Sequence, residues 1–341
     1  MEQAAVACHP NVQRILGPIM QNFLWPLRFI GSRIVLLVLA SLIIFFSMAF
    51  LPGDPAEVIL GVDAQPDTLA ALHHKLGLDQ PLPVQYWHWA TGFFQGDFGR
   101  SYGYNVPVWY LLAERLQVSL PLAGFALTAA VALGVALGVF TATRRGTWLD
   151  LVFMGGIQLT KAVPDFWLAM LLTGFFSLSL HWFPAGGFSG WGQGVGAALR
   201  SLVLPAVALA LPQAAVLARY TRSAVIAVLE EPFILTARAH GLSERQVLFR
   251  HVLPRSLPSV LAVLSLQIPL LLSGTIIVEN VFNLKGTGAL LLEAVNQRDV
   301  PVVQACVLLI VAVVVFEKGL FQWLEIRLSP WLSSDRNGHA A

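Results

Sequence analysis

The sequence has few charged residues and almost no cysteine. Asp, Glu, Lys and Arg make up 12% of its 341 residues, about half the share of an ordinary soluble domain. Most of the chain therefore faces something other than water. The two cysteines, Cys8 and Cys306, fall in a predicted tail and in a predicted membrane helix, which makes a disulfide between them geometrically implausible.

A nucleotide-binding P-loop is also missing. That motif needs a Gly followed by a Lys, yet the residues before the lysines are His74, Thr160, Leu284 and Glu317. We therefore expect no ATPase site on this chain. Energy for uphill transport would have to enter through a partner or an ion gradient.

What the sequence does have is a series of apolar runs, each near the roughly 20 residues needed to cross a bilayer. We place membrane helices at 29–51, 116–143, 151–180, 202–220, 260–278 and 300–320. The first run is uncharged from Ile34 to Leu51 and no small-residue cleavage site follows it, so it predicts a retained anchor. The predicted fold class is all-α, a polytopic protein with six transmembrane helices.

Positive charge predicts the orientation of these helices. With an even number of spans both termini lie on one side, and the cytoplasmic side is the one rich in Lys and Arg. One side holds Arg14, Arg28, Arg33, Arg144, Arg145, Arg219, Arg222, Arg238, Arg245, Arg250, Arg255, Lys318, Arg327 and Arg336. The other holds only Lys75, Arg100, Arg115, Arg200, Lys285 and Arg298. We expect the lead-in 1–28 and the tail 329–341 to be cytoplasmic.

The segment 52–115, between the first two spans, lies on the outer side in this orientation. A short helix is predicted over 67–76, where leucines recur at helical spacing and Gly77 provides a stop. Aromatic residues expected at the membrane interface are Tyr86, Trp87 and Trp89. The segment is therefore interpreted as a small outer cap packed on the membrane.

Two short patterns are typical of enzymes or metal sites, but their positions in this chain favour neither function. Gly187 to Gly190 reads GFSG, as in membrane serine proteases, but Ser189 falls in an outer loop and no later span supplies a histidine to accept its proton. His73 and His74 are adjacent, so on a helix they point about 100° apart and do not converge on one ion. We expect no catalytic residue and no metal site.

Two charged residues lie inside the third span. Lys161 and Asp165 are four residues apart and can neutralise each other, and Pro164 between them predicts a kink. A proton relay, a substrate contact and a structural ion pair at a helix break all remain open. A gradient-driven secondary transporter would be favoured if both residues were essential and the chain alone moved substrate.

The inner loop, residues 222–258, contains the stretch TARAHGLSERQVLFRHVLP from Thr236. Gly241 can adopt the left-handed conformation that ends one helix, and Ser243 with Gln246 can form a capping box that starts the next. Two such helices are typical of DNA-binding helix-turn-helix proteins. A DNA reader also needs a third helix, and here both ends are tethered to spans, so no nucleic-acid partner is expected.

We interpret this loop as a docking surface for another protein. Its expected contacts are apolar side chains surrounded by arginines: Phe233, Leu242, Val247 and Phe249, with Arg238, Arg245 and Arg250.

The same stretch resembles the cytoplasmic loop of the inner-membrane permease subunits of binding-protein-dependent ABC importers. Their pattern is E-A-A, three residues, Gly, nine residues, I, one residue, L-P. Departures from this pattern stand at Leu235, Thr236 and His251. The matching positions are Ala237, Gly241, Leu253 and Pro254.

Other segments are similar to the first permease of dipeptide, oligopeptide and nickel importers. They are FLPGDPA at 50–56, LGLDQPLPVQY at 76–86, GDFGRS at 96–101, TARAHGL at 236–242, and the group Glu279, Phe282, Gly286, Gly288, Arg298, Asp299 and Pro301. Lys285 stands where that subfamily commonly has Pro. The resemblance extends from about Arg28 to Pro330.

The resemblance implies a type I ABC importer permease fold over 116–328, in which the inner loop inserts a coupling helix into an ATPase. The coupling residues would be Ala237, Arg238, Ala239, His240, Gly241, Leu242, Ser243, Leu253 and Pro254. Residues expected either to line the pathway or to be structural are Lys161, Asp165 and Glu279.

The resemblance also implies partners and a location. The partners are a second homologous permease, two ABC ATPase subunits that use ATP and Mg²⁺, and a periplasmic binding protein, all at a bacterial inner membrane. No cofactor is expected on this chain. The expected cargo is a di- or oligopeptide, with nickel or another small solute as the alternative.

Overall fold

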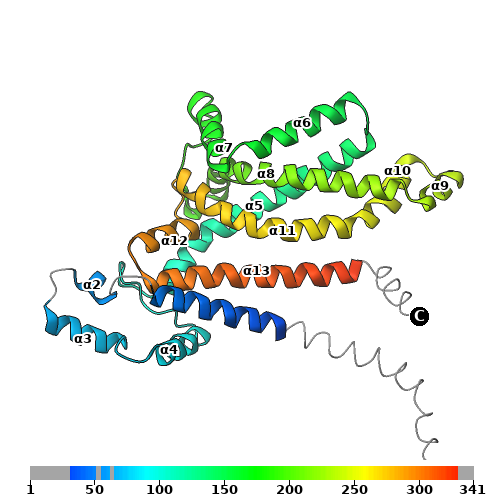
Figure 1. The fold of residues 1–341 in the computed structure, drawn as a ribbon. Coiled ribbons are helices and arrows are strands. Elements are labelled where there is room, and N and C mark those ends of the chain that lie inside the picture. The colour runs from blue at the N-terminus through cyan, green and yellow to red at the C-terminus, as the bar shows by residue number, and fades with distance from the viewer. Residues whose placement is uncertain (1–30, 51–54, 62–64, 329–341) are drawn as a thin grey trace, which may run out of the picture.

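The computed structural model describes residues 31–50, 55–61 and 65–328, and within these residues every regular element is a helix. Five helices are long and apolar enough to cross a membrane. They comprise Gly31–Ala49, α5 (Val108–Thr143), α8 (Val195–Leu229), the helix containing α11 (Leu253–Val281), and α13 (Val300–Leu328). They run along one common direction (Figure 1). The predicted all-α membrane fold is confirmed.

The third predicted span differs from the prediction. Instead of one helix over 151–180 there are two, α6 (Trp148–Ala162) and α7 (Asp165–Leu172), the second continued by a π-helical segment, Thr173–Ser179. The two halves are bent by 104° and count as a sixth span only if the bent pair is one span. The break follows from Pro164, because proline forces the residue before it into an extended conformation.

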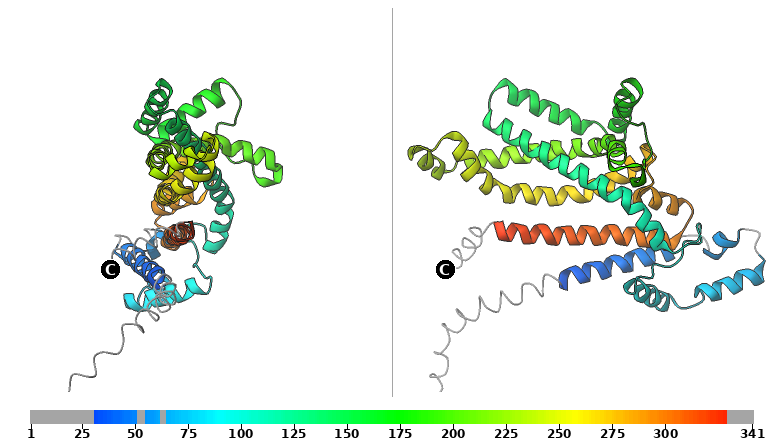
Figure 2. Two further views of the ribbon diagram at one scale, coloured as in Figure 1. Left: turned by 90° about the vertical axis from the view of Figure 1, so that its right-hand side faces the viewer. Right: turned by 180° about the vertical axis from the view of Figure 1, so that it is seen from behind.

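The core forms around α8, which contacts α5, α6, α7 and α11. Two glycines of α5 let it approach α8 closely. A Cβ added to Gly138 would lie 2.5 Å from Thr221 Cβ, and one added to Gly134 would lie 2.8 Å from Leu217 Cβ. Small residues four apart permit this backbone contact in membrane helices. The two helices lie side by side along much of their length (Figure 2).

Four short helices gather at one end of the molecule: α2 (Pro55–Leu60), α3 (Pro66–Leu76), α4 (Leu82–Phe94) and α12 (Thr287–Asn296) (Figure 1). The predicted helix over 67–76 is confirmed as α3, and Gly77 ends it with φ +68°. Helix α4 lies against the first span, where the hydroxyls of Tyr86 and Ser41 are 2.8 Å apart.

Two further short helices, α9 (Pro232–Ala239) and α10 (Glu244–Val247), lie at the opposite end (Figure 1). They connect directly to long helices. Helix α8 runs to Leu229, and residues 244–281 are helical without a break, passing through a π-helical segment at Leu248–Val252. Much of the inner loop is therefore a continuation of α8 and α11.

Candidate functional site

The turn of the inner loop is built as its sequence predicts. Gly241 has φ +80°, the left-handed region that favours glycine. The Ser243 hydroxyl accepts the Gln246 backbone N–H at 3.4 Å, and the Gln246 side chain accepts the Ser243 N–H at 2.9 Å. This reciprocal capping box fixes the start of α10.

An ion pair closes the same turn. The guanidinium of Arg238, near the end of α9, donates from Nε and Nη2 to the two carboxylate oxygens of Glu244 at 2.9 and 3.1 Å. A bidentate arrangement of this kind constrains both the distance and the angle between its partners. The ion pair therefore links the two short helices across the turn.

The underside of the loop packs on the chain itself. Ile234, Val247 and Val252 are fully buried and form a cluster with Ala142 and Val225. The centroid of the Phe233 ring lies 4.1 Å from the guanidinium carbon of Arg255, which stands over the ring.

This packing corrects part of the sequence-based prediction. Of the four apolar side chains expected to meet a partner, Phe233, Leu242 and Val247 pack against this internal cluster. Phe249 alone of the four is strongly exposed, at 66%. Leu235, where the sequence departs from the family's loop pattern, is 68% exposed. It lies about 100° around α9 from the buried Ile234.

Two further ion pairs brace the base of the inner loop. Arg222 of α8 donates from Nε and Nη2 to Asp150 at the start of α6, at 2.9 and 2.7 Å. Arg145, just before α6, pairs with Glu230 at the end of α8. The inner ends of α5, α6 and α8 are thus connected beside the two short helices.

A buried carboxylate organises the end of the molecule opposite the inner loop. Glu279, near the end of α11, is fully buried and accepts the Ser119 hydroxyl at 2.6 Å. It also accepts two backbone N–H groups of the first turn of α12, from Gly288 at 2.8 Å and Ala289 at 3.0 Å. A carboxylate at a helix N-terminus is favoured both by these donors and by the helix dipole.

Glycine is required beside this carboxylate. A Cβ on Gly286 would lie 2.2 Å from the Glu279 carboxyl carbon. The carboxylate thus joins α5, α11 and α12 at one point. Of the two roles expected for Glu279, this geometry favours the structural one.

A second buried carboxylate, Asp299, lies between α12 and α13. It accepts the Ser101 hydroxyl and the Gly103 N–H, the latter at 3.1 Å, and so fastens the turn between Arg100 and Pro107. Burial, and then the Asp299 charge, raise the pKa of the nearby Tyr102 to about 12. Sequence patterns alone assigned Asp299 no role.

The expected Lys161 and Asp165 pair lies at the break of the third span. The two residues belong to different helices, so the i, i+4 geometry of one continuous helix does not apply. The Asp165 carboxylate lies beside α11, where a Cβ on Gly274 would be 3.6 Å from its Oδ2. The side chain of Lys161 lies outside the described part of the structure, and a pair between them stays a prediction.

Comparison with known proteins identifies the chain. The family described as "Binding-protein-dependent transport system inner membrane component" matches residues 134–330, and the N-terminal family of the same membrane component matches 20–123. The chain belongs to this family. The resemblance seen in its sequence is confirmed, and the chain is an ABC importer permease subunit of the multi-pass inner-membrane type.

Relatives of this permease cover most of its length. A putative peptide transport system permease of Brucella suis biovar 1 is 40% identical over 282 residues, which are 83% of this chain and 90% of that protein. The glutathione transport system permease protein GsiC of Salmonella typhimurium is also 40% identical, over 83% of this chain and 89% of its own.

A solved relative shares the fold. A chain of the MetNI methionine ABC transporter in an inward-facing conformation superposes on this permease with a TM-score of 0.53. The match covers 64% of this permease and 96% of that chain at 18% identity.

Proposed function

We propose that this permease forms, with a second homologous permease, the translocation path of an ATP-driven importer. Permeases of this family work with ATPase and binding-protein partners. The missing P-loop in the sequence supports an ATPase site on separate subunits that bind ATP and Mg²⁺. This chain would then be a transport subunit and not an enzyme.

We infer that the inner loop receives the movement of the ATPase subunits. The observation that carries this inference is its direct connection to the spans: only two residues separate α9 from α8, and α10 is continuous with α11. A displacement of the loop would therefore reach both spans directly. Exposed residues of the loop, among them Leu235, Ala239, His240 and Phe249, are available for docking.

The same proposal orients the molecule. The inner loop carries several of the arginines that predict a cytoplasmic side, and α2, α3, α4 and α12 lie at the opposite end (Figure 1). That opposite end would face the periplasm and the binding protein. Both termini would be cytoplasmic.

Peptide is the cargo that the comparisons support best. Two relatives at 40% identity are named for transport of peptide and of glutathione, itself a tripeptide. We therefore propose di- or oligopeptides as the solute.

Reconstitution tests this function. The permease pair, both ATPases and the binding protein would be placed in proteoliposomes, and uptake of a radiolabelled dipeptide, a tripeptide and ⁶³Ni²⁺ would be compared. We expect peptide accumulation that needs ATP. Accumulation of nickel without peptide would contradict the cargo, and peptide accumulation driven by an ion gradient without ATP would contradict the mechanism.

A further inference from the structure

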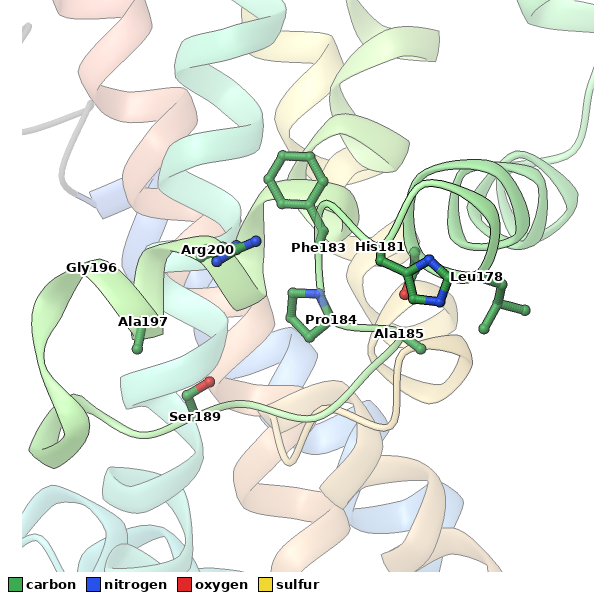
Figure 3. Close-up of a pocket in the computed structure, with 10 residues that line it drawn as sticks. Leu178, His181, Phe183, Pro184, Ala185, Ser189, Gly196, Ala197 and Arg200 are labelled. Atoms are coloured by element: carbon green, nitrogen blue, oxygen red, sulfur yellow. The ribbon is translucent and has the colours of Figure 1, made fainter.

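A cleft of about 900 Å³ opens at the end of the molecule away from the inner loop (Figure 3). It lies between the end of the third span and the start of α8. One wall consists of Ser177, Leu178, His181, Phe183, Pro184 and Ala185, and the other of Gly196, Ala197 and Arg200, with Ser189 from the connecting loop. Its size falls within the roughly 300–1,000 Å³ of small-molecule sites.

Arg200 is held in place with part of its binding capacity unused. Its Nε and Nη2 donate to the backbone carbonyl of Trp182 at 3.0 and 2.5 Å. These bonds occupy the Nε edge of the guanidinium, and its Nη1 has no hydrogen-bond partner among the described residues. A guanidinium stays protonated, and two adjacent N–H groups match the two oxygens of a carboxylate.

The rest of the lining suits a small solute with one anionic end. None of the described residues that line the cleft is acidic, so nothing in its wall neutralises Arg200. Hydroxyl groups come from Ser177 and Ser189, and apolar surface comes from Leu178 and Phe183. Figure 3 shows Arg200 and Phe183 on the same side of the connecting loop.

We propose that this cleft binds the C-terminal carboxylate of an incoming peptide, with Arg200 as the residue that contacts it. The proposal rests on the proposed peptide cargo and adds a position for its recognition. The cleft would receive solute at the outer end of the spans, before the path opens toward the inner side. Apolar side chains of the peptide would lie against Phe183 and Leu178.

The experiment compares a free peptide with its C-terminal amide, which lacks the negative charge. Uptake of radiolabelled alanyl-phenylalanine and of alanyl-phenylalanine amide would be measured with the complete importer in proteoliposomes. The variants are Arg200→Gln, Arg200→Lys, which keeps the charge, and Arg298→Asn, which removes an outer arginine elsewhere. The ratio of acid to amide uptake is independent of how much variant protein is folded.

We expect Arg200→Gln to raise the KM for the free acid about tenfold, since a hydrogen-bonded charge contact is lost from a partly exposed site. Uptake of the amide should change by less than about twofold. Arg200→Lys should restore part of the preference for the acid, and Arg298→Asn should leave it unchanged.

Three results would overturn the proposal. An Arg200→Gln variant with an unchanged preference for the acid would exclude a carboxylate contact. An equal loss for acid and amide would instead assign Arg200 to loop structure or to contact with the binding protein. If the unaltered importer moved neither peptide, the proposed cargo itself would fail, and this inference with it.

Discussion

Replacing Glu279 by alanine should destabilise the outer end of the permease more than any nearby change at an exposed acidic residue. The carboxylate accepts two backbone N–H groups at the start of α12 and the hydroxyl of Ser119 in α5. Ser119 in turn accepts the Thr287 N–H at 2.7 Å. Alanine would remove the acceptor on which three helices converge.

The expected loss can be worked out from the donors left behind. The N–H groups of Gly288 and Ala289 would lose the acceptor they have here, whereas the Ser119 hydroxyl can rotate to another acceptor. A buried donor without a partner costs roughly 1–3 kcal/mol, so Glu279→Ala should cost about 2–6 kcal/mol. Glu279→Gln should cost about 1–2 kcal/mol, because the amide oxygen still accepts both N–H groups while the amide nitrogen donates to Ser119.

Thermal unfolding in detergent, followed by tryptophan fluorescence, measures the loss of stability in each variant. The Tm should fall slightly for Glu279→Gln and much further for Glu279→Ala. Glu114→Ala, at an exposed acidic residue of α5, is the matched control and should change stability by less than about 0.5 kcal/mol. Equal Tm values for Glu279→Ala and Glu114→Ala would refute the capping role of this carboxylate.

Three further predictions follow from local geometry. Gly241→Val should uncouple ATP hydrolysis from import while the protein still inserts, because φ +80° is strained for a β-branched residue. Gly241→Asn should stay coupled. Equal uptake per ATP hydrolysed in both variants would contradict a role of this turn in coupling. Gly138→Leu should abolish folded protein on size-exclusion chromatography, whereas Gly124→Leu on the same helix, with no described atom within 4 Å of its Cβ position, should not. Brominated lipids should quench Trp87, which is 68% exposed, more than Trp89, whose ring centroid lies 5.8 Å from that of Phe45. The fraction of fluorescence quenched should therefore fall more in Trp87→Phe than in Trp89→Phe. The reverse order would place the exposed face of α4 away from lipid.

The parts of the structure that could be predicted are those set by neighbouring residues. Gly241, Ser243 and Gln246 determine a turn and a helix start within six positions, so the sequence alone predicted both. Pro164 predicted a kink for the same reason, although the observed bend of 104° divides the predicted span into two helices. Hydropathy was less informative about helix length, because Arg200 and Arg222 end the apolar run of the fourth span without ending α8.

The parts that could not be predicted depend on residues far apart in the chain. Ser119 and Glu279 are separated by 160 positions, and nothing near either residue indicates the other. The burial of Val247 is similar, because the residues that bury it, Ala142 and Val225, lie in α5 and α8. The spacing of Gly134 and Gly138, by contrast, was visible in the sequence as a close-packing signal and was not used.

Helices α8 and α11 connect the inner loop to the cleft at Arg200 and to Glu279. At about 1.5 Å per residue, the part of α8 from Arg200 in the cleft to Leu229 before the turn extends over roughly 45 Å. Helix α11 likewise runs from α10 to Glu279.

Each of these helices contains two internal prolines, at 205 and 212 in α8 and at 258 and 269 in α11. A proline removes one backbone hydrogen bond, so bending concentrates there. Arg200 and Glu279 both lie on the outer side of these prolines. Under the proposed coupling, a displacement of the inner loop would reach the cleft and the start of α12 as a change of angle at the prolines. The contacts around Arg200 and Glu279 can stay intact while the helices that carry them change their relative tilt.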